Sequence, residues 1–182
     1  MLPLSQMLTI DKMMTDKAIM RTMNLFGVIV YTVEHPYIVK MLRDKDYWAS
    51  LNARTKGWIL YAIRPDDNHI HLTEEYLLPH LGITDSSTLP QLVILAAAPG
   101  MQIMQQNFPI DDTDVETAYH SIERIIGIVT QAASRIIPQE RNGVNVYREV
   151  VAAVKSELAT ERWKQVSGEF MGLIRELIGF LS

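Results

Sequence analysis

The chain has 182 residues, of which 48% are hydrophobic and 21% charged, with a net charge of −4 and an isoelectric point near 5.7. This length and composition predict one globular domain with a sizeable core and exclude an intrinsically disordered chain. The chain has no cysteine, which excludes thiol–disulfide exchange, cysteine nucleophiles, iron–sulfur clusters and thiolate zinc sites. Lysines and arginines are scattered along the sequence, so we expect no nucleic-acid partner.

The N-terminal residues show no targeting signal. The stretch MLPLSQMLTIDKMMTDK lacks the uninterrupted apolar core of a signal peptide, and no apolar run reaches the ~18 residues expected of a membrane span. We therefore expect a cytoplasmic protein with no transmembrane segment. Met7, Ile10, Met14 and Met20 follow roughly helical spacing, which predicts a helix that packs on the domain or binds a partner.

The next segment predicts a strand, a helix and a second strand. Residues 26–33 read FGVIVYTV, a β-branched and aromatic run typical of a strand covered on both faces. Pro36 suits the first turn of a helix whose apolar stripe extends to Arg54, with a kink or restart at residues 44–46. Residues 58–64 (WILYAIR) predict the second strand, so the segment reads as a right-handed βαβ unit with parallel strands.

The following residues predict a hairpin and a long helix. A short helix closes at Gly82, residues 91–97 form a third strand, and residues 101–108 pair back on it as a fourth. Thr113 to Glu116 read as a capping box, with the Thr113 hydroxyl as the cap. The helix that follows ends at Pro138. Its predicted buried face consists of Val115, Tyr119, Ile122, Ile126, Val129, Ala133 and Ile136.

The C-terminal residues carry two apolar stripes after a turn at residues 141–143. Tyr147, Val150, Val154 and Leu158 form the first, and an offset near Thr160 allows either two helices or one helix that changes its buried face. The second stripe is wide enough to predict a contact surface, either on the domain itself or at a seam with a second copy or a partner helix. Its residues are Trp163, Phe170, Leu173, Ile174, Leu177, Ile178 and Leu181.

The order of elements and the run Leu89-Pro90-Gln91-Leu92 at the mouth of the third strand resemble the thioredoxin-like fold over residues 25–137. The resemblance implies an α/β domain at 25–138, with β-α-β-α-β-β-α order, a four-stranded sheet and helices on both faces. Helical extensions at 1–24 and 143–182 flank it. In that family a cis-proline enters the third strand, which the weak trans preference of X–Pro bonds permits. The alternative is a trans proline at a strand start in another α/β arrangement.

The resemblance fails at the place where the chemistry of the family lies. Reactive cysteines follow the first strand in thioredoxin-like oxidoreductases, whereas residues 32–37 here read TVEHPY, so redox catalysis is excluded. The similar glutathione-transferase branch has a polar pair that would match Asp112 and Thr113, but adjacent aspartates repel a carboxylate ligand. Binding of a glutathione-like small ligand is the alternative function. Its weak candidate residues are His35, Tyr37, Leu89 and Pro90.

Two histidine motifs are weak signals of chemistry. His69 and His71 share a side if their segment is extended, and could ligate a metal, but exposed loop histidines explain them better. His120 and Ser121 are adjacent on a predicted helix and point about 100° apart, so they form no nucleophile–base pair. We predict no catalytic residue and no cofactor. The first hypothesis is a non-redox thioredoxin-like binding or assembly module that contacts itself or a protein partner through its helical extensions.

Overall fold

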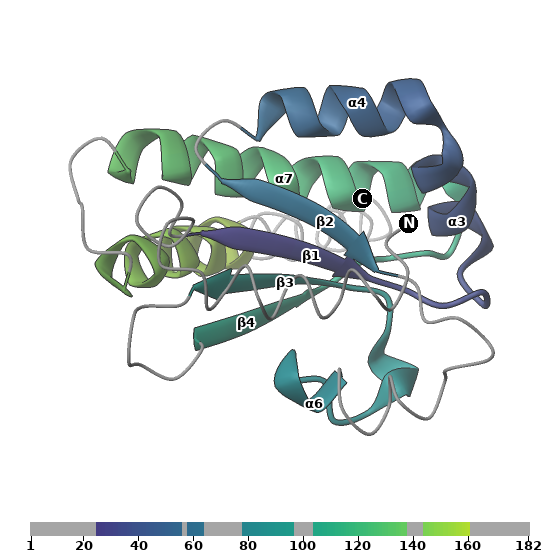
Figure 1. The fold of residues 1–182 in the computed structure, drawn as a ribbon, viewed down its shortest axis with the longest axis horizontal. Helices are drawn as coiled ribbons and strands as arrows, with labels where there is room; N and C mark the ends of the chain where they lie inside the picture. The colour runs from purple at the N-terminus through teal and green to yellow at the C-terminus, as the bar shows by residue number, and fades with distance from the viewer. Residues whose placement is uncertain (1–24, 56–57, 64–77, 97–103, 138–143, 161–182) are drawn as a thin grey trace, which may run out of the picture.

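The computed structural model describes residues 25–55, 58–63, 78–96, 104–137 and 144–160 (Figure 1). They form an α/β unit in which helices pack against a four-stranded mixed sheet, which confirms the predicted α/β class. Residues 144–160 are helical. The other elements are β1 (Phe26–Val30), α3 (Pro36–Arg43), α4 (Lys45–Arg54), β2 (Ile59–Ile63), α6 (Leu78–His80), the 3-10 helix η3 (Ser86–Thr88), β3 (Gln91–Ala96), β4 (Met104–Pro109) and α7 (Val115–Ile136).

The strands lie in the order β2-β1-β3-β4. β1 and β2 run parallel, with Val28 opposite Tyr61, as the predicted βαβ unit requires. β3 is antiparallel to β1, and β4 is antiparallel to β3, which confirms the predicted hairpin pairing. β1 and β3 occupy the two central positions, and every residue of both strands is buried. This burial explains why their sequences are nearly continuous apolar runs.

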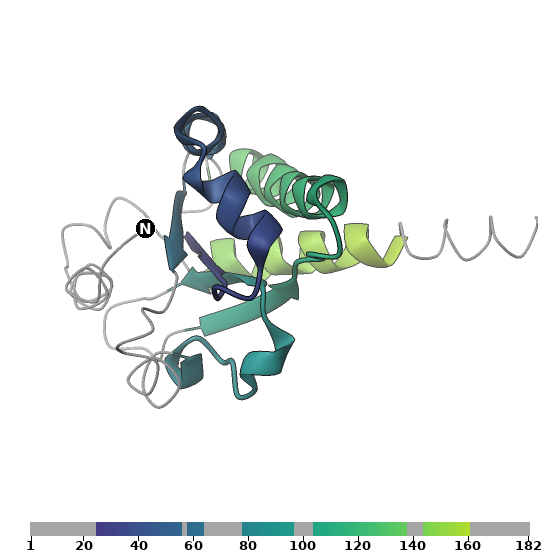
Figure 2. The same cartoon turned by 90° about the vertical axis from the view of Figure 1, so that its right-hand side faces the viewer.

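The core lies mainly on one side of the sheet. Alternate residues of β1 and β3, such as Ile29 and Ile94, join the buried face of α7 and the 144–160 helix in one hydrophobic cluster. Figure 2 shows α3, α4 and α7 on this side of the sheet, and α6 with η3 on the other. The alternating β1 residues Phe26, Val28 and Val30 are also buried. Both faces of the sheet are therefore covered.

Gly27 and Trp58 hold the sheet close to α7. A Cβ atom at Gly27 would overlap the Trp58 ring, so only glycine leaves room for the indole over β1. Trp58 is 2% exposed, and its Nε1–H donates to Thr130 Oγ1 on α7 over 3.2 Å. The indole thus fills the space between sheet and helix and keeps its one polar group bonded.

The helical segment after β1 breaks at Asp44, as the charged residues there predict. Asp44 ends α3 and begins α4, and its carboxylate accepts the N–H groups of Asp46 and Tyr47 over 2.9 and 3.1 Å. A side-chain acceptor at this position satisfies amides that the first turn of a helix leaves without partners. The restart therefore follows from one aspartate.

Two expectations about α7 are wrong. The N-cap is Asp114, whose carboxylate accepts the Thr117 N–H over 2.9 Å, because the Thr113 side chain bonds to Asp111 instead. Val115 and Tyr119 are 41% and 42% exposed although their spacing matches the buried face. The other five residues of the predicted face are buried, and the last of them, Ile136, ends the helix before Pro138.

A polar seam joins α4 to α7. Arg54 Nη1 and Nη2 lie 2.5 and 2.6 Å from Glu123 Oε2 and Oε1 in a two-point ion pair, and these bonds lower the pKa of the Glu123 carboxyl. The rings of Tyr47 and Tyr119 pack with their centroids 5.6 Å apart. The Tyr47 hydroxyl is buried near the Glu123 carboxylate, and burial, reinforced by that carboxylate, raises its pKa.

The helix at 144–160 packs on the domain. Tyr147, Val150 and Val154 of the first predicted stripe are buried in the same cluster as the sheet, and Leu158 packs against it. This stripe therefore has its own partner within the chain. The second stripe, Trp163 to Leu181, lies outside the described residues, as do the predicted N-terminal helix and the histidines at 69 and 71.

Candidate functional site

The candidate site lies at the end of the sheet where β1 and β2 finish. Val30 pairs with Ile63 on one side and with Gln91 on the other, and Gln91 pairs with Pro109. This register places the ends of β1, β2 and β4 and the start of β3 at the same end of the sheet. The β1–α3 turn, the loop before β3 and the connection from β4 to α7 therefore meet there. Sequence reasoning placed its weak ligand-binding candidates in the first two of these segments.

His35 ties the β1–α3 turn to the loop before β3. Its Nδ1 accepts the Thr32 N–H over 3.0 Å, so the neutral ring carries its proton on Nε2. That Nε2–H donates to the Leu89 carbonyl over 2.9 Å. Thr32 Oγ1 also lies 2.9 Å from Nδ1 and accepts the Glu34 N–H. Both ring nitrogens of His35 are thus engaged within the chain.

The loop at Leu89 and Pro90 is buried and satisfied by its own chain. The Leu89–Pro90 peptide bond is cis, as the sequence resemblance implies. The Leu89 N–H donates to Ser86 O over 3.2 Å, and Pro90 O accepts the Ile110 N–H over 2.9 Å. Leu89 is 7% exposed. With the His35 bond, each main-chain polar group of this pair of residues has a partner.

Asp112 occupies the N-terminus of α3. Its Oδ1 accepts the Ile38 N–H over 3.0 Å, across 74 residues of sequence. Burial raises the pKa of Asp112, while the Ile38 bond and the neighbouring His35 oppose the rise. The start of a helix favours an anion, and here the chain supplies that anion itself. Tyr37 is half-buried and packs against the hydrophobic core, so it does not extend the site.

These contacts bear on the glutathione alternative. Asp112 faces α3, whereas the Asp111 carboxylate accepts from the Thr113 N–H over 3.0 Å and from its hydroxyl. The pair that would match the family's carboxylate-binding residues is thus committed to internal bonds. Of the candidate ligand-binding residues, His35 and Leu89 bond to each other, and Pro90 O bonds to the Ile110 N–H.

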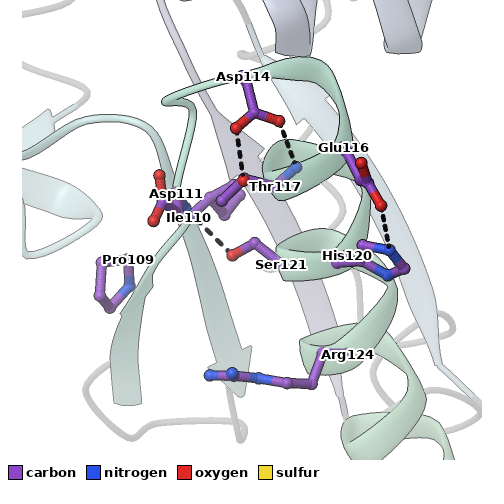
Figure 3. A pocket seen from close by; sticks show the side chains of 9 residues that line it. All are labelled: Pro109, Ile110, Asp111, Asp114, Glu116, Thr117, His120, Ser121 and Arg124. Carbon is purple, nitrogen blue, oxygen red and sulfur yellow. Dashed lines mark hydrogen bonds and ion pairs between the residues drawn. The ribbon is translucent and has the colours of Figure 1, made fainter.

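A shallow groove of about 710 Å³ runs beside the cluster of His35, Leu89 and Asp112, between α7 and residues 109–111 (Figure 3). Ser121 Oγ accepts the Asp111 N–H over 3.1 Å, and the Asp114 carboxylate holds both the N–H and the hydroxyl of Thr117. His120 turns the other way, with Nε2 3.7 Å from Glu116 Oε1. As expected, His120 and Ser121 point apart and form no nucleophile–base pair (Figure 3).

A second groove, of about 480 Å³, lies between β4 and the segment from α6 to η3. Gln91 lines it and is 8% exposed; its Nε2 donates to Thr88 O over 3.0 Å and to Thr88 Oγ1 over 2.7 Å. Its Oε1 is buried and finds no hydrogen-bond partner among the described residues. None of the lining residues is charged. They are Gly82, Ile83, Thr84, Thr88, Gln91, Gln105, Gln106 and Asn107.

Sequence reasoning missed the roles of Thr32, Asp112 and Gln91. The partners of Asp112 and of His35 lie 74 and 54 residues away, and no local pattern marks contacts of that range. Gln91 had a signal, because an amide inside a buried apolar strand needs partners. His69 and His71 lie outside the described residues, and within the described ranges no three acidic or histidine side chains cluster in a way that could hold a metal ion.

Comparison with known proteins adds no relative to these observations. Searches with models of protein families, among curated proteins and among solved structures find no match for the chain. Among the described helices, none is long and apolar enough to cross a membrane.

Proposed function

We propose that this chain is a thioredoxin-like module that binds proteins and carries no redox chemistry. Three features support the assignment of the scaffold: the parallel β1–β2 pair joined through helices, the antiparallel β3–β4 hairpin, and a proline at the entrance of β3. They follow the order that the sequence resemblance implies. The absence of cysteine removes the thiol on which the family's oxidoreductases depend.

One observation carries the functional part of the proposal. Where the family would place its reactive sulfur, His35 bonds to Leu89 O and Asp112 bonds to Ile38 N–H. A small ligand that used this site would have to displace buried contacts that are already satisfied, and each lost contact would leave a polar group without a partner. The geometry therefore favours a scaffold whose outer surfaces act, over a ligand-binding pocket at the Pro90 loop.

The surface we propose for protein contact is the second C-terminal stripe. The first stripe, at 147–158, already packs on the domain, so it cannot also bind a partner. The wide apolar arc that follows it, represented by Phe170, Leu173 and Leu177, is what remains of the helical extension for a seam with a second copy or another protein. We further propose that the chain self-associates through this arc.

The test substitutes residues of the arc and none of the described residues. Leu173→Glu with Leu177→Glu places two charges on the arc, and Arg175→Glu introduces the same residue between them on the polar side. Light scattering across a dilution series measures the mass of each protein. We expect the wild type and Arg175→Glu to associate, and the double variant to have a lower mass at each concentration because it loses the arc contact. A wild type that stays monomeric at all concentrations contradicts self-association through the arc.

A further inference from the structure

β4 directs some of its main-chain groups away from β3. The Ile110 N–H donates to Pro90 O over 2.9 Å, just beyond the last paired residues. Bonded and non-bonded pairs alternate along an antiparallel ladder, so the pair Leu92 and Phe108 is bonded in the same way. The N–H and C=O of Asn107, one residue away, therefore point outward. No described strand pairs with this edge of the sheet.

Two neighbours of Asn107 support this outward direction of its main-chain groups. Pro109 has no N–H and stands at the next outward position, where no bond to β3 is lost. The side chain of Gln106 donates from Nε2 to Asn107 O over 3.1 Å, which is possible because that carbonyl points away from β3. That carbonyl keeps a second lone pair for another donor.

The chemistry of this edge suits a copy of itself. β4 reads MQQNFP and has no charged residue, although edge strands commonly carry charges that keep other strands away. The main chain of Asn107 turns one N–H donor and one C=O acceptor away from β3, so this position is complementary to its own duplicate. Two copies side by side meet no like-charge repulsion. The groove beside β4 is uncharged as well.

We propose that β4 pairs antiparallel with β4 of a second copy, about a two-fold axis near Asn107. The two four-stranded sheets then form one continuous sheet across the dimer, with main-chain bonds exchanged between the Asn107 residues. This surface is separate from the C-terminal arc, so the inference stands or falls independently of the proposed function.

The test uses charge at Gln106. Around such an axis the two copies of Gln106 lie diagonal to each other, within roughly 8 Å. We expect Gln106→Lys and Gln106→Glu each to raise the dimer dissociation constant roughly tenfold or more in sedimentation velocity. An equimolar mixture of the two variants should restore the dimer. Gln131→Lys and Gln131→Glu, on an exposed position of α7, are the matched controls and should sediment as the wild type does.

A second pair of variants keeps the test independent of charge. Asn107→Pro removes the outward N–H, and Asn107→Ala keeps it while removing the side chain that bonds to Gly82 O over 3.3 Å. In the Leu173→Glu, Leu177→Glu background, which removes the arc contact, we expect the proline variant to be monomeric and the alanine variant to dimerise, with circular dichroism confirming that both fold. A parent protein that is monomeric in this background, or dimers that persist there in Gln106→Lys, Gln106→Glu and Asn107→Pro, would overturn the inference. If only the substitutions at Leu173 and Leu177 abolish association, the C-terminal arc is the interface.

Discussion

The end of the sheet at His35 and the edge of the sheet at β4 differ in how the chain treats its polar groups. At the first, Leu89 O, Ile38 N–H and both ring nitrogens of His35 have partners within the chain. At the second, the main chain of Asn107 faces outward, and in the groove beside β4 the buried Gln91 Oε1 has no partner among the described residues. Polar groups that already have partners gain no hydrogen bond from a ligand, whereas polar groups without partners gain one when a partner is added. This contrast favours binding at the outer surface of the molecule over binding at the Pro90 loop.

The largest effect on stability is expected when the hydrogen bonds of His35 are removed. His35→Ala removes the bonds to Thr32 N–H and Leu89 O and leaves buried groups without partners. We expect a loss of about 1–3 kcal/mol in the free energy of unfolding, measured by chemical denaturation. His120→Ala is the matched control, because that histidine is largely exposed and should change stability by less than about 0.5 kcal/mol. Equal losses in the two variants would show that His35 does not close the site.

Asp112 separates the role of its hydrogen bond from the role of its charge. Asp112→Ala removes the cap on Ile38 N–H and should cost about 1 kcal/mol. Asp112→Asn keeps an acceptor without the partly buried charge, so its stability should equal or exceed that of the wild type at neutral pH. Denaturation of the two variants side by side measures the difference. A loss in Asp112→Asn as large as that in Asp112→Ala would mean that the charge itself stabilises α3.

Gln91 probes the other region. Gln91→Met has a similar length and removes two hydrogen bonds together with an acceptor that already lacks a partner. We expect a change within about 1 kcal/mol, smaller than that of His35→Ala, because the wild type already carries the cost of the unmet acceptor. Thermal and chemical denaturation measure it. If Gln91→Met costs as much as His35→Ala, Gln91 Oε1 has a partner in solution and the contrast between the regions is lost.

The pH dependence of stability should have opposite signs at Asp112 and Glu123. Burial raises the pKa of Asp112 in the folded protein, so its contribution is fully present below its unfolded pKa and is lost as pH rises through the raised value. The bonds to Arg54 lower the pKa of Glu123, so its contribution is present above its unfolded pKa and is lost as pH falls. Acid titration of stability for Asp112→Asn and Glu123→Gln, each against the wild type, should give differences of opposite slope. Slopes of the same sign would mean either that the pKa of Asp112 is not raised or that the pKa of Glu123 is not lowered.

The smallest expected effect is the response to glutathione. Because His35 is bonded to Leu89 O and Asp112 to the Ile38 N–H, the thermal midpoint of unfolding should not move when glutathione is added. A rise in the midpoint that His35→Ala enhances would show a ligand competing for this end of the sheet. It would restore the small-ligand alternative.

Much of the architecture can be predicted from local patterns. The apolar runs predict β1, β2 and β3, the charged residues at 44–46 predict the restart of the helix, and Pro138 predicts the end of α7. Periodicity did not predict the exposure of Val115 and Tyr119, because it reports which residues share a face and not how far that face is covered. It also gave no sign that Asp114, with its longer-reaching carboxylate, would cap α7 instead of Thr113.

The candidate site was predictable in place but not in role. His35 and Pro90 were picked out by their positions after the first strand and before the third. Their engagement depends on partners 54 and 74 residues apart in the sequence, namely His35 with Leu89 and Asp112 with Ile38. Such contacts are set by the tertiary packing of the loops, and a single sequence carries no pattern for them.

The indole over Gly27 gives the protein an optical reporter of its own assembly. Trp58 touches β1 and bonds to Thr130 of α7, so its environment changes when the sheet and this helix separate. Its emission colour should shift to the red as water reaches the ring, and replacing Trp48 and Trp163 with phenylalanine would leave Trp58 as the sole fluorophore of its type. Each stability measurement above can then be followed without an added dye.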